Sequence, residues 1–292
     1  MKKLYLIAGL LFLVGPLFSE PFVTQEAHGL GLLGFEVGVK SSYAQDTWKQ
    51  EGTATCDRVQ TLTRISLFSR FGLLRMLEVG VSVPYRMWQL EDKNLDLKTD
   101  DKGLGQVRGY IKYNVIGGLA VAVNAQAPTA DVDKTLGEGT NVGAMVIFTQ
   151  KVLPVKTSIN VGYLMKMKYK DEAENEYNPA DPIFVRAAAE VPLGDFSIIG
   201  EAIAQMFNKS KYKPVGFSEE EVANSDGSTI DLILGAQYNR KLMKARLGVS
   251  VGVGDENYRA GLRASEPSQV VHFYDSWDWK VLLQLSYKIK IL

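Results

Sequence analysis

The sequence predicts an all-β fold, namely a transmembrane antiparallel up-and-down β-barrel of about 12 strands with short periplasmic turns and long extracellular loops. Three observations predict this class. Apolar and polar side chains alternate with a period of two residues along most of the chain. Short and long connections alternate between these segments along the chain. No segment after residue 19 is apolar for long enough to form a membrane helix, and a closed barrel leaves no backbone group unpaired in lipid.

The clearest hairpin lies between residues 103 and 131. In its first strand, Val107 and Ile111 share one face while Arg108 and Lys112 share the other. The chain then turns at two consecutive glycines, and the alternation of apolar and polar residues resumes. The same pattern recurs to the end of the chain, which distinguishes a barrel from a single amphipathic hairpin.

The other strands follow from the same alternation. The predicted strands are 35–40, 59–68, 77–86, 106–115, 119–127, 142–148, 158–166, 183–191, 196–206, 230–238, 247–253 and 277–291. The predicted short turns are 70–75, 116–118, 151–156, 192–195 and 239–244, and the intervening connections are long and polar. Short connections at one end of the strands and long connections at the other are typical of outer-membrane barrels. The alternative fold, a secreted β-sandwich or periplasmic β-protein, does not require this alternation.

The chain divides into three parts. Residues 1–19 form a secretory signal peptide, because Lys2 and Lys3 precede a short apolar run. Residues 20–33 are not a clean strand, and they form either a periplasmic segment or a hatch inside the barrel. Residues 34–292 form the barrel itself.

Charged residues recur on the polar face of the predicted strands, and charge facing lipid is costly, so we expect them to face the lumen. The candidates for lumen lining are Glu36, Lys40, Arg64, Glu78, Arg86, Arg108, Lys112, Lys166, Arg186, Glu190, Glu201, Asp231, Arg246, Lys280 and Lys288. Two interpretations stay open. These residues line a pore and set its ion preference, or they form a paired network that fills and stiffens the barrel.

Composition excludes several other classes of function. The chain has 33 basic and 33 acidic residues, so we expect no nucleic-acid partner. Its single cysteine, Cys56, cannot build an internal disulfide, and we assign it to a loop. The two histidines, His28 and His272, are too few for a typical zinc site, and no catalytic triad is evident around them. We therefore expect no catalytic residues, no cofactor and no metal site, and acidic loops that bridge lipopolysaccharide through divalent ions.

Four segments carry a resemblance to a known family: EPFVTQEAHGLGLLGFEVGV, SLFSRFGLLRMLEVGVSVPY, GLGQVRGYIKY and AQAPTADVDKTLGEGTNVG. They resemble the outer-membrane barrel family named for the meta-pathway of phenol degradation, which is related to the FadL-type hydrophobic-compound transporters. The resemblance implies a channel or transporter for passive uptake of small, hydrophobic or aromatic, solutes, and it suggests that residues 20–33 could form the hatch. The alternatives are a non-transporting structural or adhesive barrel and an outer-membrane lipase.

The expected surroundings follow from this class. We expect a monomer in the bacterial outer membrane, exported by a cleaved signal peptide. Its partners would be outer-membrane lipid and lipopolysaccharide, the outer-membrane assembly machinery and a small-molecule solute.

Overall fold

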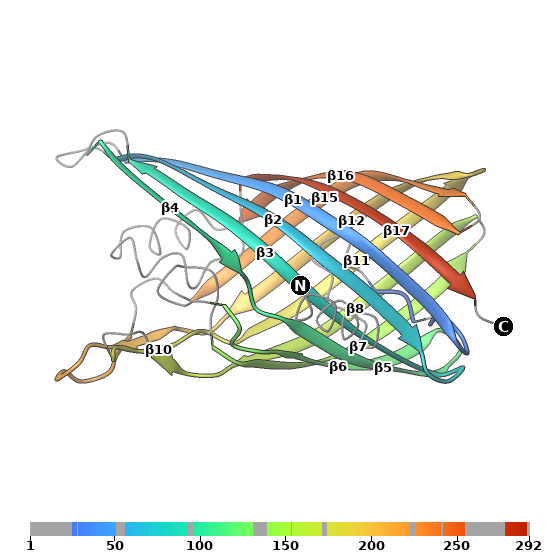
Figure 1. Cartoon of the computed structure of the whole chain (residues 1–292), viewed down its shortest axis with the longest axis horizontal. Coiled ribbons are helices and arrows are strands. Elements are labelled where there is room, and N and C mark those ends of the chain that lie inside the picture. Colours follow the sequence, from blue (N-terminus) through green and yellow to red (C-terminus); the bar gives the residue numbers. More distant parts are fainter. Residues whose placement is uncertain are drawn as a thin grey trace, which may run out of the picture.

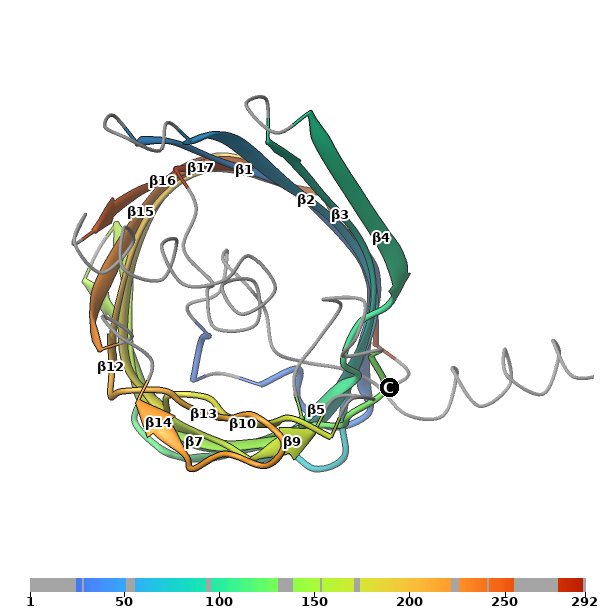
Figure 2. The same ribbon diagram turned by 90° about the vertical axis from the view of Figure 1, so that its left-hand side faces the viewer.

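The computed structural model describes residues 25–27, 29–50, 56–92, 96–130, 139–152, 154–170, 174–221, 226–240, 242–254 and 278–290. Twelve antiparallel strands form a closed barrel, in which the first strand pairs with the last (Figure 1 and Figure 2). In ring order they are β1 (Gly34–Gln50), β2 (Cys56–Gly72), β3 (Leu77–Asp92), β5 (Arg108–Ile116), β6 (Leu119–Gln126), β7 (Asn141–Val152), β8 (Val155–Lys166), β11 (Pro182–Leu193), β12 (Phe196–Phe207), β15 (Gly227–Arg240), β16 (Met243–Gly254) and β17 (Trp279–Lys290). The all-β class and the strand number predicted from the sequence are confirmed.

Side-chain burial alternates along the strands. On β15, Leu232 and Leu234 are 45% and 69% exposed, whereas Asp231 and Ile233 are each 3% exposed. The exposed set covers the outside of the barrel with a contiguous apolar surface, which is the surface that lipid tails cover. The buried set faces the lumen. No helix in the described part of the chain is long and apolar enough to span a membrane.

The connections differ in length at the two ends of the barrel. At the short-turn end, strand pairs such as β5–β6 and β15–β16 are separated by only two residues. At the opposite end, which we call the loop end, long connections join the strands, and β1, β2 and β3 extend beyond their neighbours (Figure 1). The predicted alternation of short and long connections is present, except that only residues 51–55 separate β1 from β2.

The first long connection is not the loop that we predicted. β1 and β2 continue as a paired hairpin from Ser41↔Ile65 to Gln50↔Cys56. Cys56 is therefore the first residue of β2 rather than a loop residue. The prediction was wrong because the outer half of β1 is polar on both faces, so the period-two signal fades while backbone pairing continues.

A second element at the loop end was also missed. β4 (Leu97–Leu104) pairs along the outer half of β3. Between β4 and β5 the chain makes a short break, where the Gly105 amide donates to the Pro84 carbonyl over 2.8 Å. β4 is Lys- and Asp-rich, so its sequence resembles a polar loop.

The two long connections after β8 and β12 fold together into a small outer sheet. It contains β9 (Tyr169–Lys170), β10 (Glu176–Asn178), β13 (Lys211–Lys213) and β14 (Glu220–Glu221). The rings of Tyr169 and Tyr212 pack on the ring of Tyr177, with centroids 5.2 and 5.0 Å apart. These strands are too short to give a periodic signal, and we predicted polar loops here.

Aromatic side chains lie on the outer face near the strand ends, as expected for interfacial girdles. Tyr85, Tyr113, Tyr163 and Tyr287 are between 40% and 47% exposed. Trp88 is only 4% exposed and does not belong to this outer set. The predicted signal peptide lies outside the described residues.

Candidate functional site in the barrel lumen

The structure gives a position to every charged residue selected from the sequence. All fifteen alternate with the exposed apolar residues of their strands, and all are buried or half-buried. Glu36, Glu78, Lys112, Glu190, Arg246 and Lys288 gather at the short-turn end, with Lys40 beside them. The others, Arg64, Arg86, Arg108, Lys166, Arg186, Glu201, Asp231 and Lys280, lie nearer the middle or the loop end of their strands.

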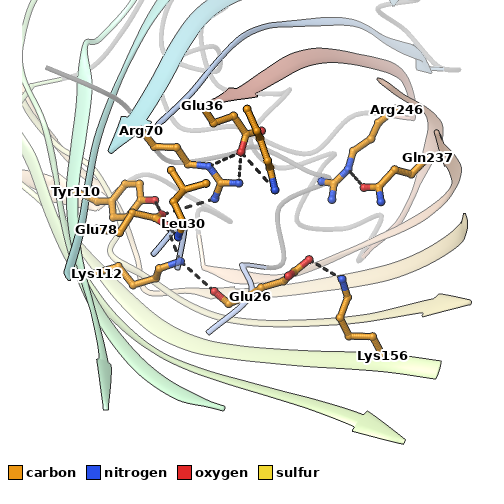
Figure 3. A network of polar contacts seen from close by, with 11 residues as sticks. Glu26, Leu30, Glu36, Arg70, Glu78, Tyr110, Lys112, Lys156, Gln237 and Arg246 are labelled. Atoms are coloured by element: carbon orange, nitrogen blue, oxygen red, sulfur yellow. Dashed lines mark hydrogen bonds and ion pairs between the residues drawn. The ribbon is translucent and has the colours of Figure 1, made fainter. Parts of the chain in front are cut away.

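A compact ion-pair network joins β1, β2, β3 and β5 at the short-turn end (Figure 3). Arg70 Nε donates to Glu36 Oε2 over 2.9 Å, and its Nη1 lies 3.6 Å from Glu78 Oε1. Lys112 Nζ lies 3.3 Å from the same Glu78 oxygen, to which the Tyr110 hydroxyl also donates. Glu36 and Glu78 are no more than 1% exposed, so these partners offset the cost of burying two charges.

A second polar chain crosses the lumen wall from β8 to β16. Lys156 Nζ lies 2.7 Å from Glu26 and 2.6 Å from Glu190. Gln237 donates to Glu190 over 3.0 Å and accepts a hydrogen bond from Arg246 Nε over 2.5 Å. The chain therefore links five side chains that come from four strands and the N-terminal segment.

The N-terminal segment contacts lumen side chains along most of its described length. Gln25 exchanges two hydrogen bonds with Asn160, of 2.8 and 3.1 Å, and the Ala27 amide donates to Thr149 over 2.9 Å. The Leu30 amide donates to Glu78 over 2.9 Å. Lys112 Nζ donates to the Glu26 carbonyl over 3.1 Å, so the network on β1–β5 and the segment share a lysine.

The fit of this segment to the wall depends on a glycine. The Leu33 amide donates to the Gly72 carbonyl over 2.8 Å. A Cβ atom at Gly72 would overlap the carbonyl oxygen of Gly31, so only glycine allows the segment to approach β2 this closely. Ala27, 3% exposed, packs against Ala120 and Ala122 of the lumen wall.

The carboxylate of Glu26 lies between cations. Burial raises the pKa of this carboxyl, but the positive charges of Lys244 and Lys156 outweigh burial and hold the pKa well below its usual value. Glu26 is therefore an anion at neutral pH, and 35% of its side chain is exposed.

Several residues of these networks were absent from the sequence-based selection. They are Glu26, Arg70, Tyr110, Lys156, Gln237 and Lys244. We assigned three of them, Arg70, Lys156 and Lys244, to turns. Each nevertheless lies two or four residues beyond the last predicted inward-facing residue of its strand, so alternation continued to its position. No periodic signal precedes Glu26, so its position in the lumen was not predictable from alternation.

The lumen face also carries apolar patches that the sequence did not indicate. Ile199, Ile203, Ile233 and Leu282 form one cluster, and Met145, Ile147 and Phe184 belong to another. β12 is apolar on both faces, so alternation could not assign these side chains to the inside. Among the described residues, no group of His, Cys, Asp and Glu could hold a metal ion, and both histidines lie outside the described residues.

Comparisons with known proteins bear on the fold. No protein-family model and no curated protein matches this chain. The crystal structure of an outer membrane channel from Pseudomonas putida is similar, with a TM-score of 0.65 at 9% identity, covering 90% of this chain and 98% of that one. The β domain of the Bordetella autotransporter BrkA gives a TM-score of 0.47 at 13% identity, covering 88% of this chain and 100% of that one. The transport unit of the Escherichia coli autotransporter AIDA-I gives 0.46 at 10% identity, covering 98% and 97%.

The first of these similarities extends over nearly the whole of both chains, whereas identity is too low to carry function or family. None of the three names the phenol meta-pathway, so that part of the resemblance stays a prediction. The chain therefore shares the closed β-barrel fold of an outer-membrane channel.

Proposed function

We propose that this protein is a bacterial outer-membrane channel for passive uptake of small solutes, hydrophobic or aromatic ones among them, and that residues 25–33 act as a hatch in its lumen. The observation that carries the proposal is that this segment is held inside a closed barrel by hydrogen bonds and ion pairs to lumen side chains. A barrel that served only as a membrane anchor would have no need of a removable lumen segment.

The contacts of the hatch are of a kind that can be broken and remade. Each hydrogen bond contributes a net ~1 kcal/mol, and the ion pair between Glu26 and Lys156 is partly open to water. A few such contacts are enough to hold the segment in place, yet weak enough for the segment to be displaced on a biological timescale. The charged lining would then conduct ions and guide polar groups of the solute.

A side exit from the barrel suits apolar solutes. β6 pairs with β5 as far as Arg108↔Gln126, and one further hydrogen bond joins the Ala127 amide to the Val107 carbonyl. Beyond this point the chain continues as β4, which pairs with β3 and with no other described strand. We infer that the wall between β4 and β6 is its weakest seam, and that an apolar solute leaves the lumen there for the lipid.

Single-channel conductance in a planar bilayer tests the proposal. We expect small or rare current steps from the intact protein, and larger, steady, salt-dependent currents after deletion of residues 20–33. The substitution Glu26→Gln provides a milder variant, which should raise the open fraction without removing any backbone. Correct folding is checked by heat-modifiable migration on gels.

If the intact protein, the deletion variant and Glu26→Gln all fold but none conducts, the channel proposal is wrong and a structural or adhesive barrel is favoured. Lipase activity that disappears in His272→Ala would instead support the enzyme alternative. Measuring both on the same preparations separates the three functions.

A further inference from the structure

One sector of the lumen wall carries four cations on three adjacent strands, β16, β17 and β1. The strand register places Arg246 beside Gln284, and Gln284 beside Lys40. One step nearer the short-turn end, Lys244 lies beside Ser286, and the next inward position of β17 is Lys288. Inward positions on one strand are about 7 Å apart, so the four charges share one patch, which we call the cationic wall.

The carboxylates nearby do not balance this wall. Glu36 lies 3.8 Å from Lys288, but the same carboxylate is bound more closely by Arg70. Among the described residues, no carboxylate lies within ion-pairing distance of Lys40 or Lys244. Lys40 instead lies over the ring of Phe68, 4.9 Å from its centroid.

The same imbalance appears over the whole short-turn end. The cations are Lys40, Arg70, Lys112, Lys156, Lys244, Arg246 and Lys288, whereas the carboxylates are Glu26, Glu36, Glu78 and Glu190. In this part of the described lumen, cations therefore outnumber carboxylates by three. Lys40 and Lys244, which have no carboxylate of the described residues within ion-pairing distance, are the cations of this set that are best placed to attract anions from solution.

The hatch supplies one of these four carboxylates. Glu26 is the only acidic side chain of the described N-terminal segment, and it faces Lys156 and the charge of Lys244. Figure 3 shows its carboxylate directed at Lys156, while its backbone carbonyl accepts from Lys112. The carboxylate of Glu26 thus lies close enough to the cationic wall for the charges of Lys244 and Arg246 to act on it.

An apolar surface adjoins the cationic wall on the side toward the loop end. Leu282 lies two residues from Gln284 on β17, and the register sets it in one row with Gly248, Gly235 and Ile199. Ile233 packs in the same cluster. Gly248 and Gly235, in the middle of this row, have no side chain to fill the lumen there. The apolar side chains of Leu282 and Ile199 lie at the two ends of the row.

We propose that the cationic wall and the adjoining apolar cluster bind an organic anion with a short apolar body, and that its carboxylate competes with Glu26 for the lumen cations. The carboxylate lies at Lys40, Lys244 and Arg246, and the apolar body lies along Ile199, Ile233 and Leu282. Binding of the anion releases the hatch, so the solute itself opens its path. This inference rests on the proposed function, because it names the solute class of the same lumen.

Isothermal titration of the folded, full-length protein in detergent tests the binding site. The probes are hexanoate, its neutral isostere hexanamide, and acetate. We expect hexanoate to bind at least 10-fold more tightly than either of the others, because it alone satisfies both the cations and the apolar cluster. Equal affinity for hexanoate and hexanamide, or no binding of hexanoate, would overturn the proposal.

Substitutions in the wall locate the site. The double substitution K40Q/R246Q should weaken hexanoate at least 10-fold, and K244Q alone should weaken it several-fold if the double variant fails to fold. The matched control is K102Q, which removes an exposed lysine of β4 on the outside of the barrel. An unchanged affinity in the folded wall variants would contradict the assignment.

Competition with the hatch is tested by Glu26→Gln. This variant keeps the shape of the side chain but removes its charge, and we expect hexanoate to bind at least threefold more tightly to it. An unchanged or weaker affinity would overturn the competition. Conductance separates this failure from failure of the channel itself, since a hatch-deleted protein that conducts but binds no hexanoate keeps the proposed function and loses only this inference.

Discussion

Two groups of ion pairs in this protein use the same residue types in opposite surroundings. In the lumen, Glu78 and Lys112 lie 3.3 Å apart, and their side chains are 1% and 2% exposed. In the small outer sheet, Lys168 lies 2.9 Å from both Glu176 and Glu219, but 51% of its side chain is exposed. In this comparison the closer contacts are the more exposed ones, so distance alone does not decide what a pair contributes to stability. Burial decides it, because a buried charge that loses its partner cannot turn to water.

The largest effect is expected from removing the charge of Glu78. The substitution Glu78→Gln keeps the size of the side chain and an acceptor for the Leu30 amide, but it leaves Lys112 buried and facing Arg70. Breaking a buried pair in this way destabilises by about 3–5 kcal/mol. Urea unfolding of the refolded barrel in detergent measures the change.

A double-mutant cycle sharpens this comparison. If the cost of Glu78→Gln comes from the stranded charge of Lys112, then adding Lys112→Gln should recover part of the lost stability. The sum of two independent losses in the double variant would mean that the charges do not interact, and the contrast with the outer sheet would then disappear.

A smaller effect on stability, but a clear one on conductance, is expected from Gly72→Ala. The added Cβ overlaps the Gly31 carbonyl, so residues 31–33 must move away from β2 although no charge changes. We expect the open fraction of the channel to rise, which a planar-bilayer recording measures. The matched control is Gly200→Ala, whose Cβ would meet no heavy atom within 4 Å.

Equal currents from the two glycine variants would mean that the backbone fit of the hatch to β2 is not what holds the hatch. The charges of Glu26 and Lys156 would then be its main anchor.

The lumen also shows where sequence periodicity is informative. One face of each strand meets lipid and is apolar, so alternation indicates which residues face the lumen. Glu36, Lys112 and Arg246 were all selected in this way. Parity continues to the strand ends, and following it there would have added Arg70 and Lys244 to the selection.

Alternation fails where its physical cause is absent. Residues 41–50 of β1 and 56–58 of β2 carry mostly polar side chains on both faces, so alternation did not indicate their pairing. The N-terminal segment is not a strand, and its contacts join residues far apart in the chain, such as Gln25 and Asn160. Such contacts depend on how the closed barrel places its walls, which no local pattern encodes.

The smallest effect is expected from Lys168→Gln in the outer sheet. Hydrogen bonds from Lys168 hold the pKa values of Glu176 and Glu219 below their usual range. A carboxyl whose pKa is lower in the folded protein stabilises the fold above its unfolded-state pKa of ~4.3, and the stabilisation is lost as pH falls through the folded-state value. Because these groups are open to water and screened by salt, the gain is small at any pH.

We therefore expect Lys168→Gln to leave the urea midpoint of the barrel unchanged and to speed amide hydrogen exchange only in the small outer sheet, most of all in β10 and β14. Acidification below the usual carboxyl range should have the same local effect on the unsubstituted protein. A loss of barrel stability comparable to that of Glu78→Gln would break the comparison, because it would mean that the outer sheet folds as one cooperative unit with the strands below it. The ion pairs at the loop end would then stabilise the barrel in spite of their exposure to water.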